Sequence, residues 1–178
     1  AEAVERGLKR REAEGLDNSQ MAPICTIMIG RTDDWLKKNT TKTGQVVLPE
    51  ALEWSGVAVI KEAYRIYKER GYTTRLLSAA NRNVYHWCEI LGGDLVQTIN
   101  YSWHKRLNAC DVEVKDRMAE VPEVYMNELN KIEEFHKSFE ENGMKPEEFV
   151  TYGGFRDTLT TFIAGYDDLC KLIRGYMI

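Results

Sequence analysis

The chain has 178 residues, of which 43% are hydrophobic and 29% are charged, the composition of one globular domain with a real core. Its net charge of -4 and the lack of a dense basic patch argue against a nucleic-acid partner. No apolar run is long enough to span a bilayer or to form a signal peptide, which argues against a membrane protein. The four cysteines are scattered without a CxxC motif, a pattern that favours a reduced cytosolic setting over a disulfide framework.

The first residues, "AEAVERGLKRREAEG", predict a helix that has only a thin apolar stripe. This segment begins with Ala1 and carries no N-cap signal. We therefore expect the chain to begin inside a helix that is preceded by more sequence, although a cleaved tag would leave the same pattern.

Three buried strands are predicted, over Ile24–Ile29, Thr74–Ala79 and Leu95–Ile99. Asp33 and Asp34 are placed to cap a short helix after the first strand, and the polar residues 39–50 predict a loop. Helical spacing of apolar residues predicts helices over 55–70, from about 83 to 91, over 101–108, over 122–142 and over about 153–174. Strands that alternate with helices indicate an α/β fold with a parallel sheet.

An arginine follows each of the first two predicted strands. Arg31 comes after "ICTIMIG", and Arg82 comes after "LLSAAN". The carboxyl ends of adjacent parallel strands meet at one edge of a sheet, where α/β proteins bind their ligands. Two guanidinium groups at that edge predict a phosphate site, because the planar fork of arginine forms bidentate bonds with phosphate. The alternative interpretation is two separate surface ion pairs.

Other residues that could carry chemistry give weaker signals. The spacings of His86, His104 and His136 relative to the cysteines match no zinc signature, and His86 falls on the polar side of its predicted helix, so we expect no metal site. The aromatic residues in the later helices are predicted to lie in the core; they are Trp87, Trp103, Phe162 and Tyr166.

Three segments resemble the transaldolase family. "TIMIGRTDDW" resembles the family segment Ser-Pro-Phe-Val-Gly-Arg followed by two variable residues and Asp-Trp. "YKERGYTTRLLSAANRN" is similar to a helix and strand that end in Gly-Ala-Ser-Phe-Arg-Asn, and "LGGDLVQTINYSWHKRL" is similar to the next strand and helix. The motifs occur in the family's order and cover residues 1–108, whereas the last seventy residues or so match only loosely.

The resemblance implies a (β/α)8 TIM barrel and Schiff-base chemistry on sugar phosphates without a metal or other cofactor. It matches Arg31 and Arg82 to the family's phosphate-binding arginines and Thr26 to a substrate-proximal serine. Two departures affect the phosphate site: Ala80 replaces a serine, and Asn81 replaces a phenylalanine but is retained as a substrate-proximal candidate.

We therefore expect the C-terminal part of such a barrel, about strands six to eight, with βα units over residues 1–121 and C-terminal helices over 122–178 on the same domain. The intact enzyme would be a cytoplasmic transferase of the pentose phosphate pathway that moves a dihydroxyacetone unit between sugar phosphates. The Schiff-base lysine is expected upstream of residue 1, so we expect this chain to be inactive alone. Its expected partner is the missing N-terminal half of the barrel or a second copy. The alternative function is a non-catalytic sugar-phosphate-binding or assembly subunit.

Overall fold

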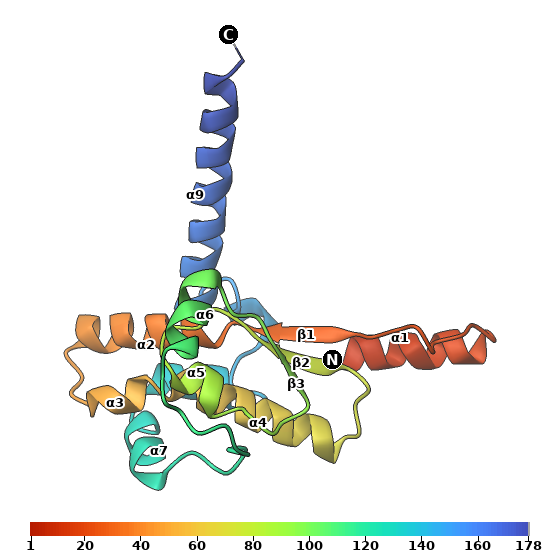
Figure 1. The fold of residues 1–178 in the computed structure, drawn as a ribbon, viewed down its shortest axis with the longest axis horizontal. Helices are drawn as coiled ribbons and strands as arrows, with labels where there is room; N and C mark the ends of the chain where they lie inside the picture. Colours follow the sequence, from red (N-terminus) through yellow and green to blue (C-terminus); the bar gives the residue numbers. More distant parts are fainter. Residues whose placement is uncertain (178) are drawn as a thin grey trace.

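A computed structural model describes residues 1–177 and shows a mixed α/β fold (Figure 1). In chain order its elements are α1 (Glu2–Ala13), β1 (Ile24–Ile27), α2 (Ile29–Thr43), α3 (Pro49–Leu52), α4 (Ser55–Glu69), β2 (Arg75–Ser78), α5 (Tyr85–Cys88), β3 (Leu95–Gln97), α6 (Tyr101–Asn108), α7 (Glu123–Leu129), α8 (Glu133–Phe139), a 3-10 turn (Pro146–Glu148) and α9 (Gly153–Gly175).

The three strands form one parallel sheet in the order β1-β2-β3, as the alternation of strands and helices predicts. Cys25 pairs with Leu76, which pairs with Leu95, and the next row joins Thr26, Leu77 and Val96. Because successive side chains on a strand point to opposite faces, these two rows belong to the two faces of the sheet. The register brings the carboxyl ends of β1 and β2 side by side.

The two faces of the sheet differ in burial. Leu76, on one face, is 2% exposed and packs in a cluster with Ile29, Ile60 and Ile90, which joins the sheet to α2, α4 and the end of α5. On the opposite face Ile24 is 46% exposed and Thr26 is also exposed. The helices α2 and α4 therefore cover one side of the sheet and leave the row of Thr26 open.

A second apolar cluster joins the C-terminal helices to the first half of the chain. Leu129, Ile132 and Phe135 are completely buried and pack with Leu36 of α2 and Ala58 of α4. The helices α7 and α8 thus contribute to the same core as the α/β segment.

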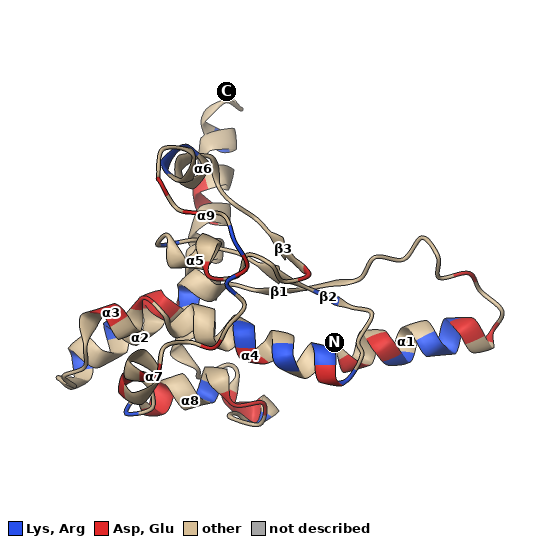
Figure 2. Ribbon diagram, turned by 60° about the horizontal axis from the view of Figure 1, so that its bottom comes forward, with Lys and Arg blue, Asp and Glu red and all other residues tan. Residues whose placement is uncertain are grey.

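Two helices extend away from this body (Figure 1). The first is α1, and the second is α9, whose first turn packs on α2 and whose remainder stands clear of the other elements. Acidic and basic positions are interspersed along α1 and α4, as Figure 2 shows. No helix within residues 1–177 combines the length and the hydropathy that a membrane crossing requires.

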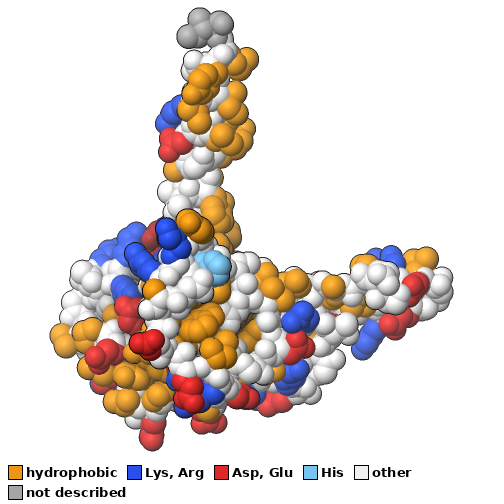
Figure 3. Space-filling view, in the orientation of Figure 1, with side chains coloured by type: hydrophobic (Ala, Val, Ile, Leu, Met, Phe, Trp, Pro, Cys, Tyr) orange, Lys and Arg blue, Asp and Glu red, His pale blue; other side chains and the backbone are white. Residues whose placement is uncertain are grey.

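The projecting part of α9 exposes apolar side chains, as Figure 3 shows. Phe162 is 56% exposed and Tyr166 is 67% exposed, so the prediction that these two residues lie in the core is wrong.

Several predicted boundaries after the first strand are wrong. The strand ends at Ile27, and the apolar residues that follow begin α2 instead. Asp33 lies inside α2 and does not cap it, and most of the predicted loop 39–50 is helical, in α2 and α3. A short apolar run does not by itself distinguish a strand from the start of a buried helix, and here packing against β2 and α4 selects the helix.

The predicted helix over 122–142 is also wrong, because it is broken between α7 and α8. The break brings both Leu129 and Ile132 into the core. The backbone carbonyls that the break frees find other donors: Gln45 Nε2 donates to the Lys131 carbonyl at 2.6 Å, and the His136 ring lies 3.0 Å from the Asn130 carbonyl. The helix predicted from about residue 83 to 91 is likewise only one turn, α5.

Candidate functional site

The structure brings Arg31 and Arg82 together at the carboxyl edge of the sheet. Arg31 lies in the first turn of α2, directly after β1, and Arg82 lies in the loop after β2. Both guanidinium groups approach the carboxylate of Asp34. Arg82 Nε donates to Asp34 Oδ2 at 3.0 Å, Arg82 Nη2 lies 2.9 Å from the same oxygen as an ion pair, and Arg31 Nη1 lies 3.8 Å from it. Two cations therefore share one anion at this edge.

A close backbone contact holds the two arginine segments against each other. A Cβ atom at Gly30 would lie 1.7 Å from the carbonyl oxygen of Ala80, so only glycine fits immediately before Arg31. Ala80 itself has a φ of 65°, a left-handed conformation that is costly for a residue with a side chain. The loop after β2 is thus strained where it meets α2, two residues before Arg82.

A buried hydrogen-bonded pair, Asp33 and His86, holds the loop that carries Arg82. The two side chains are completely buried, and His86 Nε2 lies 2.8 Å from Asp33 Oδ2. Because His86 Nδ1 accepts the backbone N–H of Arg82 at 3.0 Å, the ring proton lies on Nε2 and is donated to Asp33. His86, predicted on the polar side of its helix, is thus completely buried among polar partners. This pair connects α2 directly to the backbone of Arg82.

The other oxygen of Asp33 and the side chain of Asn83 complete the network. Asp33 Oδ1 accepts the Ser55 hydroxyl at 2.6 Å and the Gly56 backbone N–H at 2.9 Å. Asn83 Nδ2 lies 3.1 Å from Asp33 Oδ2 and donates to Glu53 Oε2 at 2.7 Å. Burial opposes ionisation of Glu53, but its bonds to Lys37 and Asn83 prevail and lower its pKa. These partners hold the Arg82 loop on α2 and the start of α4.

Several polar atoms at this edge have unused hydrogen-bonding capacity. Arg31 Nε, Ser78 Oγ and both amide atoms of Asn81 are buried without a protein hydrogen-bond partner among residues 1–177. Asn81 is 2% exposed and Ser78 is 1% exposed. Buried polar groups are nearly always bonded, so these atoms indicate a place where a polar ligand would contribute the missing partners.

A small cavity lies beside Arg31, between α2 and α9. Its volume is about 200 Å³. Its lining residues are Arg31, Asp34, Trp35 and Lys38 from α2 and Gly154, Asp157, Thr158 and Thr161 from α9. Lys38 forms an ion pair with Asp157 at 2.5 Å. The guanidinium group of Arg31 makes only a longer contact, at 3.8 Å, with Asp34. The lining thus holds two cationic and two anionic side chains.

Thr26 lies five positions before Arg31, on the strand that leads to it. It sits in β1, opposite Leu77, on the open face of the sheet. In a closed barrel, residues of this face point to the interior.

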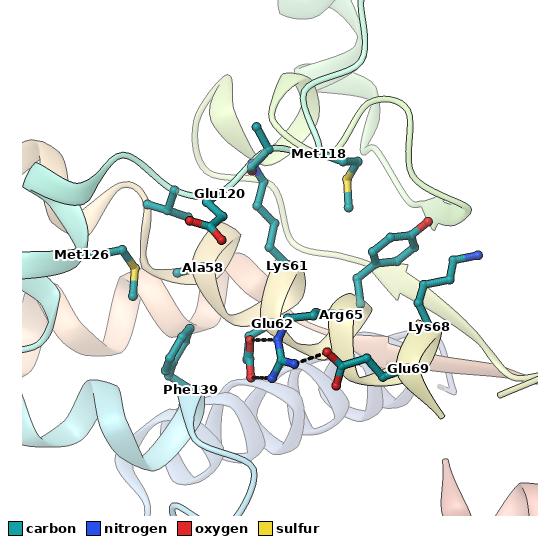
Figure 4. A pocket seen from close by; sticks show the side chains of 13 residues that line it. Ala58, Lys61, Glu62, Arg65, Lys68, Glu69, Met118, Glu120, Met126 and Phe139 are labelled. Carbon is teal, nitrogen blue, oxygen red and sulfur yellow. Dashed lines mark hydrogen bonds and ion pairs between the residues drawn. The ribbon is translucent and has the colours of Figure 1, made fainter. Parts of the chain in front are cut away.

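A larger groove lies elsewhere (Figure 4). Its volume is about 590 Å³, and it runs between α4, residues 118–121 and the helices α7 and α8. Lys61 lines this groove, and burial lowers its pKa. Its ammonium group donates to the backbone carbonyls of Arg117 at 2.9 Å and Ala119 at 2.6 Å. This lysine therefore fastens the 117–119 segment to α4 and is not poised as a nucleophile.

The remaining titratable clusters do not form a metal site in the part of the chain that is described: no group of three or more His, Cys, Asp or Glu side chains is suitably arranged there. His104 lies on the exposed surface of α6, and His136 pairs with Glu140 at 2.8 Å on α8.

Known proteins share this sequence pattern. The sequence model of the transaldolase/fructose-6-phosphate aldolase family matches residues 4–173. A transaldolase of Shewanella frigidimarina (strain NCIMB 400) is 32% identical over 99 residues, which make up 56% of this chain and 29% of that protein. A transaldolase of Trichormus variabilis (strain ATCC 29413 / PCC 7937) is 40% identical over 73 residues, 41% of this chain and 21% of that protein. One from Gloeobacter violaceus (strain ATCC 29082 / PCC 7421) is 34% identical over 91 residues, 51% of this chain and 22% of that protein. The matched segment spans less than a third of each relative.

Proposed function

Because the chain belongs to the transaldolase/fructose-6-phosphate aldolase family, we propose that its arginine edge binds the phosphate group of a sugar phosphate. The observation that carries the proposal is the convergence of Arg31 and Arg82 on the single carboxylate of Asp34. Two guanidinium groups around one carboxylate leave a net charge of about +1 at this edge, which attracts a phosphate group. The family match and the motif resemblance both support a phosphate at this edge.

Phosphate has more acceptor oxygens than Asp34 offers. Arg31 Nε and the Asn81 amide supply donors that the protein leaves unused at this edge. Hydrogen bonds between charged groups are roughly twice as strong as neutral ones, so the second guanidinium group adds substantially to affinity. Asn81 thus takes over part of the role of the hydroxyl group that Ala80 lacks.

For the fold, we propose that the three strands are about strands six to eight of a (β/α)8 barrel, with the helices α7 and α8 packing on the same domain. Eight strands are needed to close such a barrel, and its ligands bind at the carboxyl ends of the strands. The open face around Thr26 would then line the barrel interior. The missing strands would come from the N-terminal half of the barrel or from a second copy of the chain.

For catalysis, we propose that the 178-residue chain binds sugar phosphates without forming the covalent intermediate of a transaldolase. A Schiff base requires a desolvated lysine beside a base, and the sequences of β1, β2 and β3 contain no lysine. In an intact transferase of the pentose phosphate pathway, the nucleophile would come from outside these strands. The same feature supports the second candidate function, a non-catalytic sugar-phosphate-binding subunit.

Calorimetric titration tests the binding function. Fructose 6-phosphate should bind to the chain, whereas fructose should not. Arg31→Ala or Arg82→Ala should each cost about 1.5–3 kcal/mol of binding, the scale of hydrogen bonds to charged groups. Arg6→Ala, which removes an exposed arginine of α1, is the matched control and should leave the affinity unchanged. Equal affinities for all three variants would disprove the proposal.

A further inference from the structure

Two consecutive aspartates of α2 hold the two ends of Arg82. Asp34 is half-buried and accepts a hydrogen bond from the guanidinium group of Arg82 at 3.0 Å. Asp33 is completely buried and contacts His86, whose ring accepts the backbone N–H of Arg82 at 3.0 Å. One aspartate therefore fixes the side chain of Arg82 directly, and the other fixes its backbone through His86.

The direction of the Arg82 guanidinium group also depends on the backbone of its own loop. Nη1 donates to the carbonyl oxygens of Ala80 at 3.2 Å and Asn81 at 3.3 Å. A rotation of the backbone at residues 80–82 would therefore move the guanidinium group relative to Arg31. The loop has a reason to rotate, because Ala80 has a φ of 65°, a conformation that is unfavourable for a residue with a Cβ atom.

The ring of His86 supplies the contact that opposes this rotation. The ring is completely buried, and the backbone N–H of His86 donates to Asn83 Oδ1 at 3.1 Å, which fixes the residue in place. A backbone N–H can only donate, so the bond to Arg82 requires a lone pair on Nδ1 of the imidazole. Only the neutral ring with its proton on Nε2 meets this requirement.

Asp33 selects that form of the ring. Its Oδ2 atom lies 2.8 Å from His86 Nε2, and a carboxylate oxygen at this position accepts the ring proton in a hydrogen bond. Its Oδ1 atom accepts the Ser55 hydroxyl at 2.6 Å and the Gly56 backbone N–H at 2.9 Å. The carboxylate therefore cannot turn away from the ring without breaking two further buried bonds.

We propose that His86 and Asp33 are positioning residues of the phosphate site. Neither touches the ligand; the acceptor at His86 Nδ1 sets the affinity by holding Arg82 in its binding conformation. This inference rests on the proposed function, in which Arg82 binds phosphate. Arg31 lies in the first turn of a regular helix and does not depend on the acceptor. The loss of the acceptor should therefore weaken phosphate binding by no more than Arg82→Ala does.

Two substitutions of His86 separate the acceptor from the buried pair. Asparagine has an amide oxygen near the position of Nδ1 and can still accept the Arg82 N–H. Glutamine places its amide group near the position of Nε2, where it can donate to Asp33 but cannot reach the Arg82 N–H. Both variants should be less stable than the wild type, since each loses one buried hydrogen bond.

Calorimetric titration with fructose 6-phosphate measures the effect on affinity, under conditions in which circular dichroism shows each variant to be folded. His86→Gln should bind roughly fivefold to tenfold more weakly than the wild type, whereas His86→Asn should stay within about twofold of it. A purely structural pair would change the stability of both variants and the affinity of neither. His136→Gln on α8 is the matched control and should leave the affinity unchanged.

Nitrogen-15 NMR of the imidazole ring gives a readout that stability does not move. In the wild-type chain His86 should be neutral with its proton on Nε2. Asp33→Asn should transfer that proton to Nδ1, because the new amide oxygen must still accept the Gly56 N–H and its amide nitrogen then faces Nε2. This variant should lose phosphate affinity as His86→Gln does.

Arg82→Ala, titrated alongside, separates this inference from the proposed function. If Arg82→Ala binds as tightly as the wild type, the phosphate assignment and the positioning role fail together. If Arg82→Ala weakens binding but His86→Gln does not, the phosphate assignment stands and the positioning role is overturned. Equal affinities of His86→Asn and His86→Gln, or a wild-type His86 that carries its proton on Nδ1, would also overturn the positioning role.

Discussion

The side chains of Asp33 and His86 meet in the interior although they lie 53 positions apart in the chain. Replacing His86 with Leu removes the acceptor of the Arg82 backbone N–H and one partner of Asp33. Each buried polar group left unpaired costs about 1–3 kcal/mol, so this variant should be destabilised by that amount or more in urea titrations. His104→Leu on the exposed surface of α6 is the control, with an expected change within about 0.5 kcal/mol. Equal unfolding midpoints for the two variants would mean that the buried pair contributes nothing.

Cys88 gives the protein a dependence on alkaline pH. Burial, reinforced by the Glu89 carboxylate, raises the pKa of this thiol from 9.0 to about 11. The unfolded thiol therefore loses its proton at lower pH than the folded one. The stability that this shift contributes is complete below pH 9 and is lost as the pH rises to about 11.

Urea titrations between pH 8 and pH 11 measure this effect. The wild-type chain should lose more stability over that range than Cys88→Ala, whereas Cys170→Ala on α9 should behave like the wild type. Parallel pH profiles for all three proteins would contradict the assignment.

Single residues also show how far the sequence allows prediction. The sequence predicts that Arg31 and Arg82 meet at one edge, because each follows a strand and strand ends are readable from composition. Asn81 is a candidate only through resemblance, and its role stays a prediction. The sequence does not reveal the burial of His86, since its partner Asp33 is distant in the chain and resembles a helix cap. The sequence offers one signal for this contact: Asp33 follows the end of β1 and His86 follows the end of β2.

At the level of elements, the junction of α2 with the loop after β2 depends on Gly30. A methyl group there would overlap the Ala80 carbonyl, so Gly30→Ala should force these segments apart. We expect a loss of about 1–3 kcal/mol or more in unfolding free energy. Gly7→Ala in α1, where a Cβ meets nothing within 4 Å, should instead stabilise the chain by about 0.5–1 kcal/mol. Opposite signs in thermal melts are the expected result, and a neutral Gly30→Ala would refute the close contact.

The elements whose boundaries the sequence predicts well have strong local signals. The helix α4 shows clear apolar periodicity and ends before Gly71, whose φ is 61° as a helix-terminating glycine requires. The start of α2 and the break between α7 and α8 escape prediction because tertiary packing sets them. Ile29 and Ile132 each lie in a buried cluster whose other members come from distant parts of the chain, which no local pattern specifies.

For the whole molecule, the exposed apolar residues among residues 1–177 include those on the sheet face around Ile24 and those along α9. Periodicity indicates which residues of α9 lie on the same side of the helix. It does not indicate what covers that side, because the sequence of one surface does not identify its partner. The boundary between residues 121 and 122 stays a prediction, and the packing of α7 and α8 on α2 and α4 is compatible with one shared domain.

Our central proposal is that this chain binds a sugar phosphate at Arg31 and Arg82 without forming a Schiff base. The most direct test is borohydride reduction in the presence of fructose 6-phosphate, at a concentration at which calorimetry shows the chain to be saturated. Mass spectrometry should then find the chain at its unmodified mass, because its strands offer no lysine to the ketose carbonyl. A stoichiometric adduct on any lysine of the 178 residues would contradict the account.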